Sequence, residues 1–363
     1  MFFKFLATCN PGLEEIAIKE VEELIKVKAN FFHPGAIIFD SEEKAIFKLN
    51  YLSQSLHRII LLFHFSEFND LNDIYSKVVN LDLTDFIHFN QSFAIRAERF
   101  GKHNFTSIDV ARVVGQAIID NYLKTKNYKL KVNLDNPDIE IRCEVRNSLF
   151  WIGIDTTGES LHKRWYRIIG HKAPLKSTIA YSMVRLSKWN INESLCDPMC
   201  GVGTIPIEAA IWANNIPIGK YRKFNFEKFN FINKEDYKNF IEKYQCKNEN
   251  LQITGIDISI RSINGAKKNA EKAGVQINFI NGDSTKIPLD YDHIVTDLPY
   301  GIRTKRKNLK ELYENFFNNV YKYNWKSLVV ITARPELIPS IEPTKVLNVE
   351  YGDINAKIFI FLN

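Results

Sequence analysis

The chain has 363 residues, of which 45% are hydrophobic and 25% are charged, and its formal net charge at pH 7 is +6. That length and apolar content are sufficient for two domains with packed cores, and no unbroken apolar run approaches the ~20 residues that cross a bilayer. The five cysteines are odd in number and scattered, which predicts reduced thiols in a cytoplasmic protein rather than a disulfide framework.

The first 156 residues have the mixed pattern of an α+β region. The segment 1–7 is apolar but short and precedes an acidic helical pattern, so we expect a strand there rather than a signal peptide. Apolar residues at helical spacing predict helices over 13–25 and 107–123. Further strands are expected over 36–39, 93–99, 138–145 and 149–154, and a helix followed by a strand within 46–62.

Two runs of basic residues contain no acid, one over 160–176 and one over 302–310. Trp165 and Tyr166 lie inside the first run, and the second run directly follows Tyr300. Many such runs are merely solvated surface, but basic residues interleaved with aromatics also suit a phosphate backbone with splayed bases. We therefore interpret the first run as a linker that contacts RNA.

The remainder of the chain alternates regularly between strands and helices. A helix is expected from about residue 174 to 189, followed by helices over 204–214, 262–273 and 310–323. Strands are expected over 194–197, 253–259, 277–282, 294–297, 328–332, 346–349 and 357–362. This order predicts a doubly wound α/β sheet that closes with an antiparallel pair. An insertion over about 217–250 is expected to form a lobe on the substrate side.

Aspartates follow four of the predicted parallel strands, at Asp197, Asp257, Asp283 and Asp297. The carboxyl ends of parallel strands share one edge of a sheet, so these acids should form a row. After the first of them, Gly201 and Gly203 allow a tight turn into a helix that begins at Thr204, and glycines let a backbone approach a ligand. The loop lacks the three-glycine pattern of a dinucleotide site and starts with an acid, which favours an amino or sulfonium group over a pyrophosphate.

The segment 296–301 (TDLPYG) suits a planar amine. The carboxylate of Asp297 and the carbonyl of Leu298 can both accept hydrogen bonds from an exocyclic NH2 group, and the ring of Tyr300 offers a stacking face. Pro299 fixes the backbone between them. The residues leave open whether Asp297 only orients the amine or also takes its proton. No cysteine lies near this segment, which argues against methylation of a pyrimidine carbon.

These motifs resemble the class I S-adenosylmethionine-dependent methyltransferases, and specifically the guanine-N2 RNA methyltransferases that carry an N-terminal THUMP domain. The resemblance rests on 197–204 (DPMCGVGT), on 296–301, and on the linker segments 161–167 (LHKRWYR) and 171–176 (HKAPLK). The linker is similar to that of the archaeal tRNA guanine-6 N2-methyltransferases and their bacterial relatives. Many relatives have two prolines before the tyrosine, whereas this chain has Leu298 and Pro299, which preserves the backbone carbonyl but not the same rigidity.

The resemblance implies a ferredoxin-like piece plus THUMP over 1–156, a basic linker over 157–173 and a methyltransferase domain over 174–363. S-adenosylmethionine would be the cofactor, the THUMP region would hold the tRNA 3′ end, and the linker would contact the acceptor stem of the substrate. The implied catalytic segment is Asp297, Leu298, Pro299 and Tyr300. The implied cofactor residues are Asp197, Pro198, Cys200, Gly201, Gly203, Thr204, Asp257, Ile258, Asp283 and Ser284.

The predicted reaction is methylation of the N2 amine of a guanosine in tRNA at position 6, by a monomer that needs neither a metal nor a membrane. Guanine-10 of tRNA, a 23S rRNA guanine and the N6 amine of adenine remain alternatives, because the same acceptor pair serves each of these amines. A further alternative is an RNA-binding assembly factor without catalysis. His171 could contact cofactor or substrate, or it could cap the following helix. Lys176, Ser177 and Thr178 could meet the cofactor carboxylate, or they could form an ordinary first helical turn.

Overall fold

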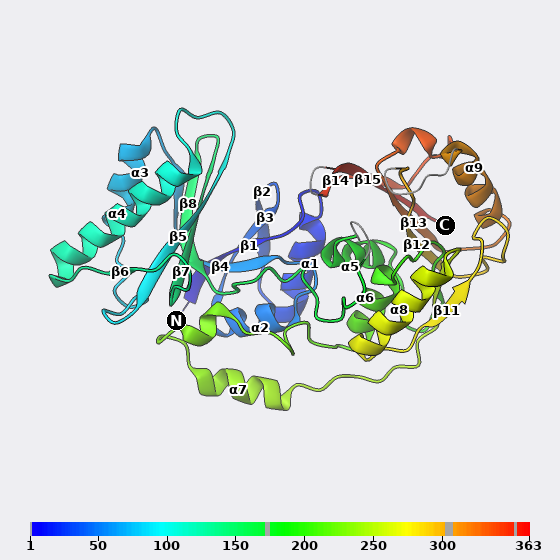
Figure 1. Cartoon of the computed structure of the whole chain (residues 1–363), viewed down its shortest axis with the longest axis horizontal. Helices are drawn as coiled ribbons and strands as arrows, with labels where there is room; N and C mark the ends of the chain where they lie inside the picture. The colour runs from blue at the N-terminus through cyan, green and yellow to red at the C-terminus, as the bar shows by residue number, and fades with distance from the viewer. Residues whose placement is uncertain (1, 171–174, 302–307, 352–353) are drawn as a thin grey trace.

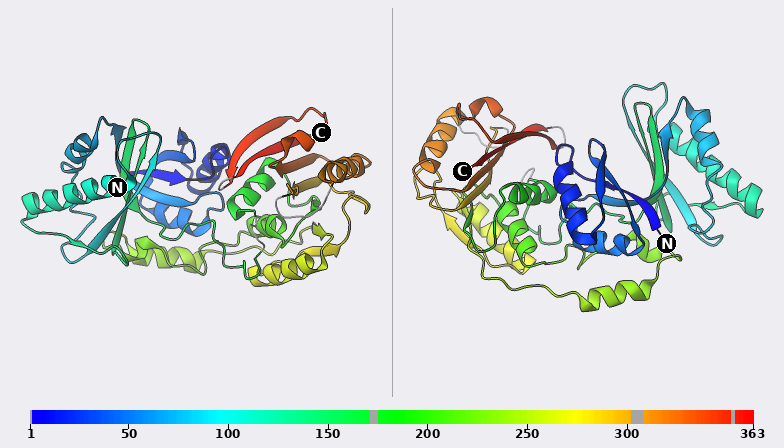
Figure 2. Two further views of the ribbon diagram at one scale, coloured as in Figure 1. Left: turned by 45° about the horizontal axis from the view of Figure 1, so that its top comes forward. Right: turned by 180° about the vertical axis from the view of Figure 1, so that it is seen from behind.

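The computed structural model describes residues 2–170, 175–301, 308–351 and 354–363. It is built around two β-sheets, one from the N-terminal half of the chain and one from the C-terminal half (Figure 1). The views from two further directions show the same two halves side by side (Figure 2). No helix among the described residues combines the length and apolarity that a membrane span requires.

The first sixty-odd residues form a ferredoxin-like β-α-β-β-α-β unit. Its elements are β1 (Phe2–Thr8), α1 (Glu14–Ile25), β2 (Ala29–His33), β3 (Ala36–Glu42), α2 (Lys44–Leu52) and β4 (Arg58–Glu67). The predicted helices and strands are confirmed here, but β2 was not predicted, because it is short and three of its five side chains are not buried.

A second α+β unit extends the same sheet. It comprises α3 (Leu71–Val78), β5 (Ser92–Phe100), α4 (Ser107–Lys126), β6 (Lys131–Val132), β7 (Ile139–Arg146) and β8 (Leu149–Asp155). Antiparallel pairing of β4 with β8 joins the units into one eight-stranded sheet of order β2-β3-β1-β4-β8-β7-β5-β6. Helix α4 starts where predicted because Thr106 and Asp109 form a capping box.

The C-terminal sheet has the predicted doubly wound topology. Its strands are β9 (Leu195–Asp197), β10 (Ile253–Asp257), β11 (Asn278–Asn281), β12 (His293–Asp297), β13 (Ser327–Thr332), β14 (Lys345–Tyr351) and β15 (Ile354–Leu362). They are ordered β11-β10-β9-β12-β13-β15-β14, and β15 runs antiparallel to the other six. The order reverses beside β9, so a crevice opens at the carboxyl ends of β9, β10 and β12.

Helices cover both faces of this sheet. On one face lie α5 (Ser177–Leu186), α6 (Thr204–Ala213) and α8 (Ile260–Ala273), and on the other lies α9 (Leu309–Val320). The described part of α5 begins at Ser177, three residues later than the predicted start. Phe316 and Phe317 of α9 are buried in a cluster with Ile294 and Leu328 of the sheet.

The insertion over 217–250 packs on the N-terminal half instead of forming the expected lobe, and we call it the strap. It holds the short helix η1 (Asn225–Lys228) and α7 (Lys234–Lys243) and runs along the N-terminal half beneath α2 (Figures 1 and 2). Tyr237 and Phe240 of the strap lie against the rings of Phe47 and Tyr51 of α2. Phe231 of the strap packs in the same way against Phe86 of the second unit, so the Phe-rich composition of the insertion reflects its packing on the N-terminal half.

The linker is also more buried than its basic composition predicted. Arg164 forms a two-pronged ion pair with Glu208 of α6, with both distances at 3.0 Å and both side chains fully buried. Tyr166 is 1% exposed and donates to the same carboxylate at 2.8 Å, and Gln54 donates to it at 2.9 Å. The expectation that Tyr166 offers its ring to RNA is therefore wrong, because the ring lies inside this junction. The junction ties α6 to the ferredoxin-like unit.

Candidate active site

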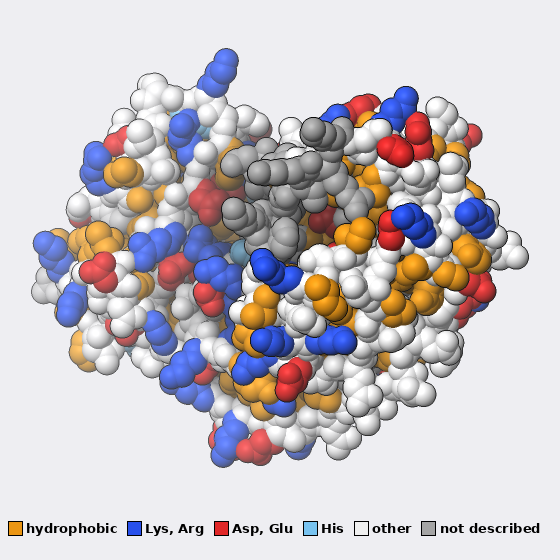
Figure 3. Space-filling view, turned by 45° about the vertical axis from the view of Figure 1, so that its right-hand side comes forward, with side chains coloured by type: hydrophobic (Ala, Val, Ile, Leu, Met, Phe, Trp, Pro, Cys, Tyr) orange, Lys and Arg blue, Asp and Glu red, His pale blue; other side chains and the backbone are white. Residues whose placement is uncertain are grey.

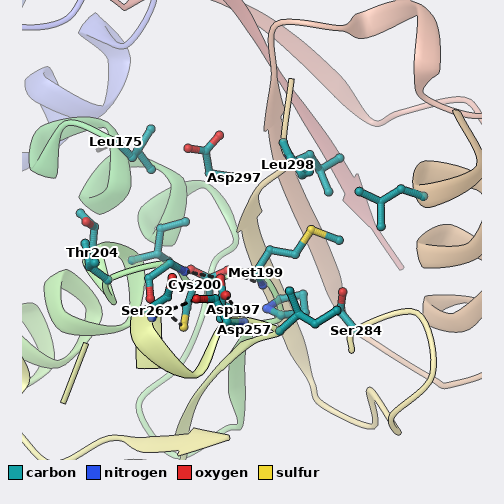
Figure 4. Close-up of a pocket in the computed structure, with 18 of the residues that line it drawn as sticks. Leu175, Asp197, Met199, Cys200, Thr204, Asp257, Ser262, Ser284, Asp297 and Leu298 are labelled. Carbon is teal, nitrogen blue, oxygen red and sulfur yellow. Dashed lines mark hydrogen bonds between the residues drawn. The ribbon is translucent and has the colours of Figure 1, made fainter. Parts of the chain in front are cut away.

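A cavity of about 330 Å³ opens at the carboxyl ends of β9, β10 and β12 (Figure 4). The sequence-predicted residues that line it are Asp197, Pro198, Cys200, Gly201, Thr204, Asp257, Ile258, Asp283, Ser284, Asp297, Leu298, Pro299 and Tyr300. The expected row of strand-end carboxylates is thus confirmed as an arrangement in space. Of the cofactor and catalytic residues that the resemblance implies, only Gly203 is absent from the described lining.

Gly203 serves the packing behind the cavity. Its backbone has φ +86°, and an added Cβ would lie 3.1 Å from the Cβ of Ala266 and 3.2 Å from the ring of Phe279. Gly201 also has a positive φ, +54°, but an added Cβ there would meet nothing within 4 Å. Gly201 therefore presents bare backbone to the cavity, whereas Gly203 lets α6 approach α8 and β11.

Asp197 is the most deeply buried acid of the row, at 2% exposure. Its Oδ1 accepts a hydrogen bond from the hydroxyl of Thr296 at 2.7 Å and from the backbone N–H of Met199 at 3.2 Å. Burial raises the pKa of Asp197 to about 8, helped by the nearby carboxylates of Asp297 and Asp257 and opposed by these hydrogen bonds. A cation placed in the cavity would favour its ionised form.

Asp257 braces the glycine loop from the neighbouring strand. One carboxylate oxygen accepts from the N–H of Gly201 at 3.0 Å and the other accepts from the N–H of Ser259 at 2.8 Å. Each oxygen can still accept a second hydrogen bond, so the carboxylate remains suitable for a pair of hydroxyl groups. Ile258 beside it is 55% exposed and forms an apolar patch on the cavity wall.

Asp283 and Ser284 follow β11. Asp283 Oδ1 accepts from the backbone and the hydroxyl of Thr285, at 3.0 and 2.7 Å, which fixes the turn. The side chain of Asn319 holds the carbonyl of Ser284 at 2.9 Å. Figure 4 shows Ser284 at one side of the cavity and Thr204 with Leu175 at the other.

The segment after β12 places Asp297 across the cavity from the glycine loop (Figure 4). The hydroxyl of Tyr300 donates to Asp297 Oδ1 at 2.5 Å. The ring of Tyr300 is only 5% exposed, so in this conformation it packs beside the carboxylate and does not display the expected stacking face. Tyr300 here orients Asp297.

The backbone of this segment is held at two points. The N–H of Leu298 donates to the carbonyl of Ile331 at 3.0 Å, and the hydroxyl of Tyr313 donates to the carbonyl of Pro299 at 3.1 Å. Tyr313 also meets the hydroxyl of Thr332 at 2.7 Å. Within the described part of the chain, no group donates to the carbonyl of Leu298, which leaves that oxygen able to accept a bond from a ligand.

Several residues of the site were not predicted from the sequence. The cavity wall also includes Leu175, Ile205, Ser259, Ser262 and Leu312. Ser259 lies two residues after the strand-end acid Asp257 and caps α8, a pattern that could have indicated it. Tyr313 could not have been found, because nothing local marks a helical tyrosine as the partner of a loop carbonyl.

The described lining carries four carboxylates and no lysine, arginine or histidine. Such a cavity suits a ligand with positive charge and hydroxyl or amino donors. Among the described residues, no group of three His, Cys, Asp or Glu side chains is arranged to hold a metal ion. His171 and the basic side chains Arg303, Lys305, Arg306 and Lys307, which the sequence singled out, lie outside the described residues.

Comparison with known proteins assigns a family to each part of the chain. Residues 164–347 match the family described as an RMKL-like methyltransferase domain, residues 68–155 match the THUMP domain, and residues 4–60 match the RlmL ferredoxin-like domain. A possible methylase from Clostridium difficile 630 has a similar structure, with a TM-score of 0.89 and 27% identity, covering 100% of this chain and 98% of that one.

Two archaeal proteins are similar over nearly the full length. The tRNA (guanine(6)-N2)-methyltransferase of Methanocaldococcus jannaschii is 42% identical, covering 98% of each chain. The protein of the same description from Archaeoglobus fulgidus is 40% identical, covering 99% of this chain and 92% of its own. The chain therefore belongs to the THUMP-domain-containing RNA guanine-N2 methyltransferases, in the branch that includes these archaeal tRNA enzymes.

Proposed function

We propose that this protein transfers a methyl group from S-adenosylmethionine to the exocyclic N2 amine of a guanosine in tRNA, at position 6 of the acceptor stem. The observation that carries the proposal is the pair of acceptors on Asp297 and Leu298, which faces an acid-lined cavity. The names of the two archaeal relatives support the choice of the base, the amine and the position.

The cavity residues fit the cofactor by charge and by shape. S-adenosylmethionine supplies an electrophilic methyl group on a positively charged sulfur. Asp197 is a buried carboxyl group with a raised pKa and no basic residue in the described lining to neutralise it, so a cation relieves an unfavourable charge. Asp257 would accept both ribose hydroxyls, and Asp283 with Ser284 would contact the adenine.

Asp297 and Leu298 would prepare the nucleophile. The lone pair of the guanine N2 amine is delocalised into the ring, which makes the nitrogen a poor nucleophile. When its two hydrogens are bonded to the Asp297 carboxylate and the Leu298 carbonyl, the nitrogen is drawn toward tetrahedral geometry and its lone pair points at the methyl group. Alignment of this kind can lower a barrier by ~7–11 kcal/mol in well-oriented reactions. Asp297 can also receive the proton that nitrogen releases.

The N-terminal half would deliver the RNA. In this proposal residues 1–156 bind the 3′ end of tRNA, the linker 157–173 lies along the acceptor stem and residues 174–363 catalyse the transfer. On the face shown in Figure 3, many lysine and arginine side chains lie in the left half and below the centre. In the linker, Lys163 is 61% exposed and pairs with the similarly exposed Glu159, so a phosphate would compete with that carboxylate for its charge.

The Asp297→Ala variant tests the catalytic assignment. It removes one of the two acceptors, so we expect methyl transfer to tRNA to fall at least about 100-fold. Cofactor affinity should stay within about twofold, because Asp257 and Asp283 are untouched. Transfer is measured with isotopically labelled cofactor and an unmodified tRNA transcript, and affinity by calorimetry. Asp290→Ala, an exposed acid outside the cavity lining, is the matched control.

Mapping of the label tests the target. We expect it on the guanine at position 6, and a transcript with adenine at that position should take up none. Label on an adenine or at guanine-10 would replace the assigned substrate. Full activity in the Asp297→Ala variant would refute the catalytic assignment. Failure of the unaltered protein to bind S-adenosylmethionine would favour an RNA-binding factor without catalysis.

A further inference from the structure

The described cavity lining has no positive charge to receive the carboxylate of the cofactor's methionine part. If Asp283 and Ser284 contact the adenine and Asp257 the ribose, the amino-acid part of the ligand points to the opposite side, where Thr204 and Leu175 lie (Figure 4). A carboxylate placed there would face a lining whose ionisable groups are all acids. Favourable binding of this carboxylate therefore requires a cationic side chain near Thr204 and Leu175 that does not itself line the cavity.

Arg167 of the linker lies on the side of the cavity formed by Thr204 and Leu175. Its Nη2 donates to the hydroxyl of Thr204 at 3.2 Å and to the backbone carbonyl of Leu175, and both residues line the cavity. The Nε of Arg167 is buried and has no hydrogen-bond partner among the described residues. A buried guanidinium N–H without an acceptor is unfavourable, so this group is suited to an anion that arrives with the ligand.

The linker around Arg167 is fixed against the glycine loop. The side chain of Asn269, on α8, bonds both the N–H and the carbonyl of Ile169, at 2.9 and 3.1 Å. The same amide nitrogen donates to the carbonyl of Val202 at 3.1 Å. The linker backbone two residues after Arg167 is therefore tied, through Asn269, to the loop that lines the cavity.

Lys176, Ser177 and Thr178, which the sequence analysis named as possible contacts of the cofactor carboxylate, do not line this cavity. Thr178 accepts hydrogen bonds from Asn10 at 2.7 Å and pairs with His57 at 3.2 Å, both in the ferredoxin-like unit. Ser177 lies 3.5 Å from the hydroxyl of Tyr166, and Lys176 lines a separate cavity beside His57. These three residues face the junction with the N-terminal half.

We infer that Arg167 binds the carboxylate of the methionine part of S-adenosylmethionine and is thus a cofactor-specificity residue contributed by the linker. The inference rests on the proposed function. It distinguishes ligands by one group: S-adenosylmethionine and S-adenosylhomocysteine have the carboxylate, whereas decarboxylated S-adenosylmethionine retains the sulfonium and the amine but lacks it.

Calorimetry with the full chain and these three ligands tests the inference without measuring catalysis. In the Arg167→Met variant we expect the Kd of S-adenosylmethionine and S-adenosylhomocysteine to rise about 10- to 100-fold, the range for a lost charged hydrogen bond. The Kd of the decarboxylated ligand should change less than about twofold. Arg112→Met removes an exposed arginine of α4 and is the control for net charge. Arg167→Lys should recover part of the lost affinity.

Two results would overturn the inference alone: unaltered affinity of Arg167→Met for S-adenosylmethionine, or an equal loss for the ligands with and without the carboxylate. Equal losses would mean that Arg167 merely supports the loop. If the substituted chain folds poorly, the Kd values of the unaltered protein still test the inference. It must bind the decarboxylated ligand at least about 10-fold more weakly than S-adenosylmethionine. No binding of any of the three ligands would refute the proposed function itself, and this inference with it.

Discussion

The buried carboxyl group of Asp197 should make cofactor binding depend on pH. Its pKa is raised to about 8 by burial, so at neutral pH most of the cofactor-free protein carries a proton there. A positively charged ligand in the cavity favours the carboxylate and lowers that pKa, so binding should release the proton. The expected direction is tighter binding as the pH rises.

The size of the effect follows from the pKa. With a bound-state pKa below 6, affinity should rise about 10-fold from pH 6 to 7, about fivefold from pH 7 to 8, and level off above pH 9. About 0.9 proton should be released per ligand at pH 7. The same raised pKa lowers the free energy of unfolding of the cofactor-free protein between about pH 4 and pH 8, because only the unfolded chain ionises there.

Calorimetry in buffers with different ionisation enthalpies measures the released proton directly. The amino group of the cofactor titrates in a similar range, so the comparison that counts is between the unaltered protein and Asp197→Asn. The difference in proton release should be close to one at pH 7 and should vanish near pH 10. If both proteins release the same number of protons at every pH, the carboxyl group is already ionised before the ligand binds and the reasoning fails.

Two further substitutions test the parts of the molecule that support the site. Tyr313→Phe removes the hydroxyl that holds the carbonyl of Pro299, so methyl transfer should fall several-fold while the Kd of S-adenosylmethionine stays constant; a parallel loss of both would show a general disturbance. Arg164→Met leaves Glu208 charged and buried, and urea titration should show a loss of about 3–5 kcal/mol in the free energy of unfolding. The double variant Arg164→Met/Glu208→Leu should be more stable than Arg164→Met, and an equal or larger loss would contradict a penalty from the unpaired charge.

The catalytic half could be predicted from the sequence because its signals are local. Four of the parallel strands are short runs with an acid at or just after their end, and the sheet brings such ends together whatever the intervening helices contain. For this reason Asp197 and Asp257, separated by the whole strap, were expected to meet. The closing pair β14 and β15 was also predicted, since no helical pattern separates these strands.

The contacts between the halves could not be predicted in this way. In the sequence, nothing distinguishes Arg164 from the other basic residues of the linker. Its burial depends on Glu208, which lies 44 positions later. The aromatic residues of the strap indicate a buried face but not which partner covers it. Phe47, Tyr51 and Phe86 supply that partner, and nothing near them in the sequence indicates a contact with the strap.

The position of the strap in the chain has a consequence for biosynthesis. It lies between α6 and β10, so it interrupts the catalytic sheet between two strands, β9 and β10, that pair directly. Its aromatic side chains pack on α2 and on Phe86, which leave the ribosome much earlier. The N-terminal half would therefore be folded when the strap leaves the ribosome. The strap would then dock on it before β10 is synthesised and pairs with β9. Expressed without its first 156 residues, the catalytic half would expose this aromatic surface and tend to aggregate.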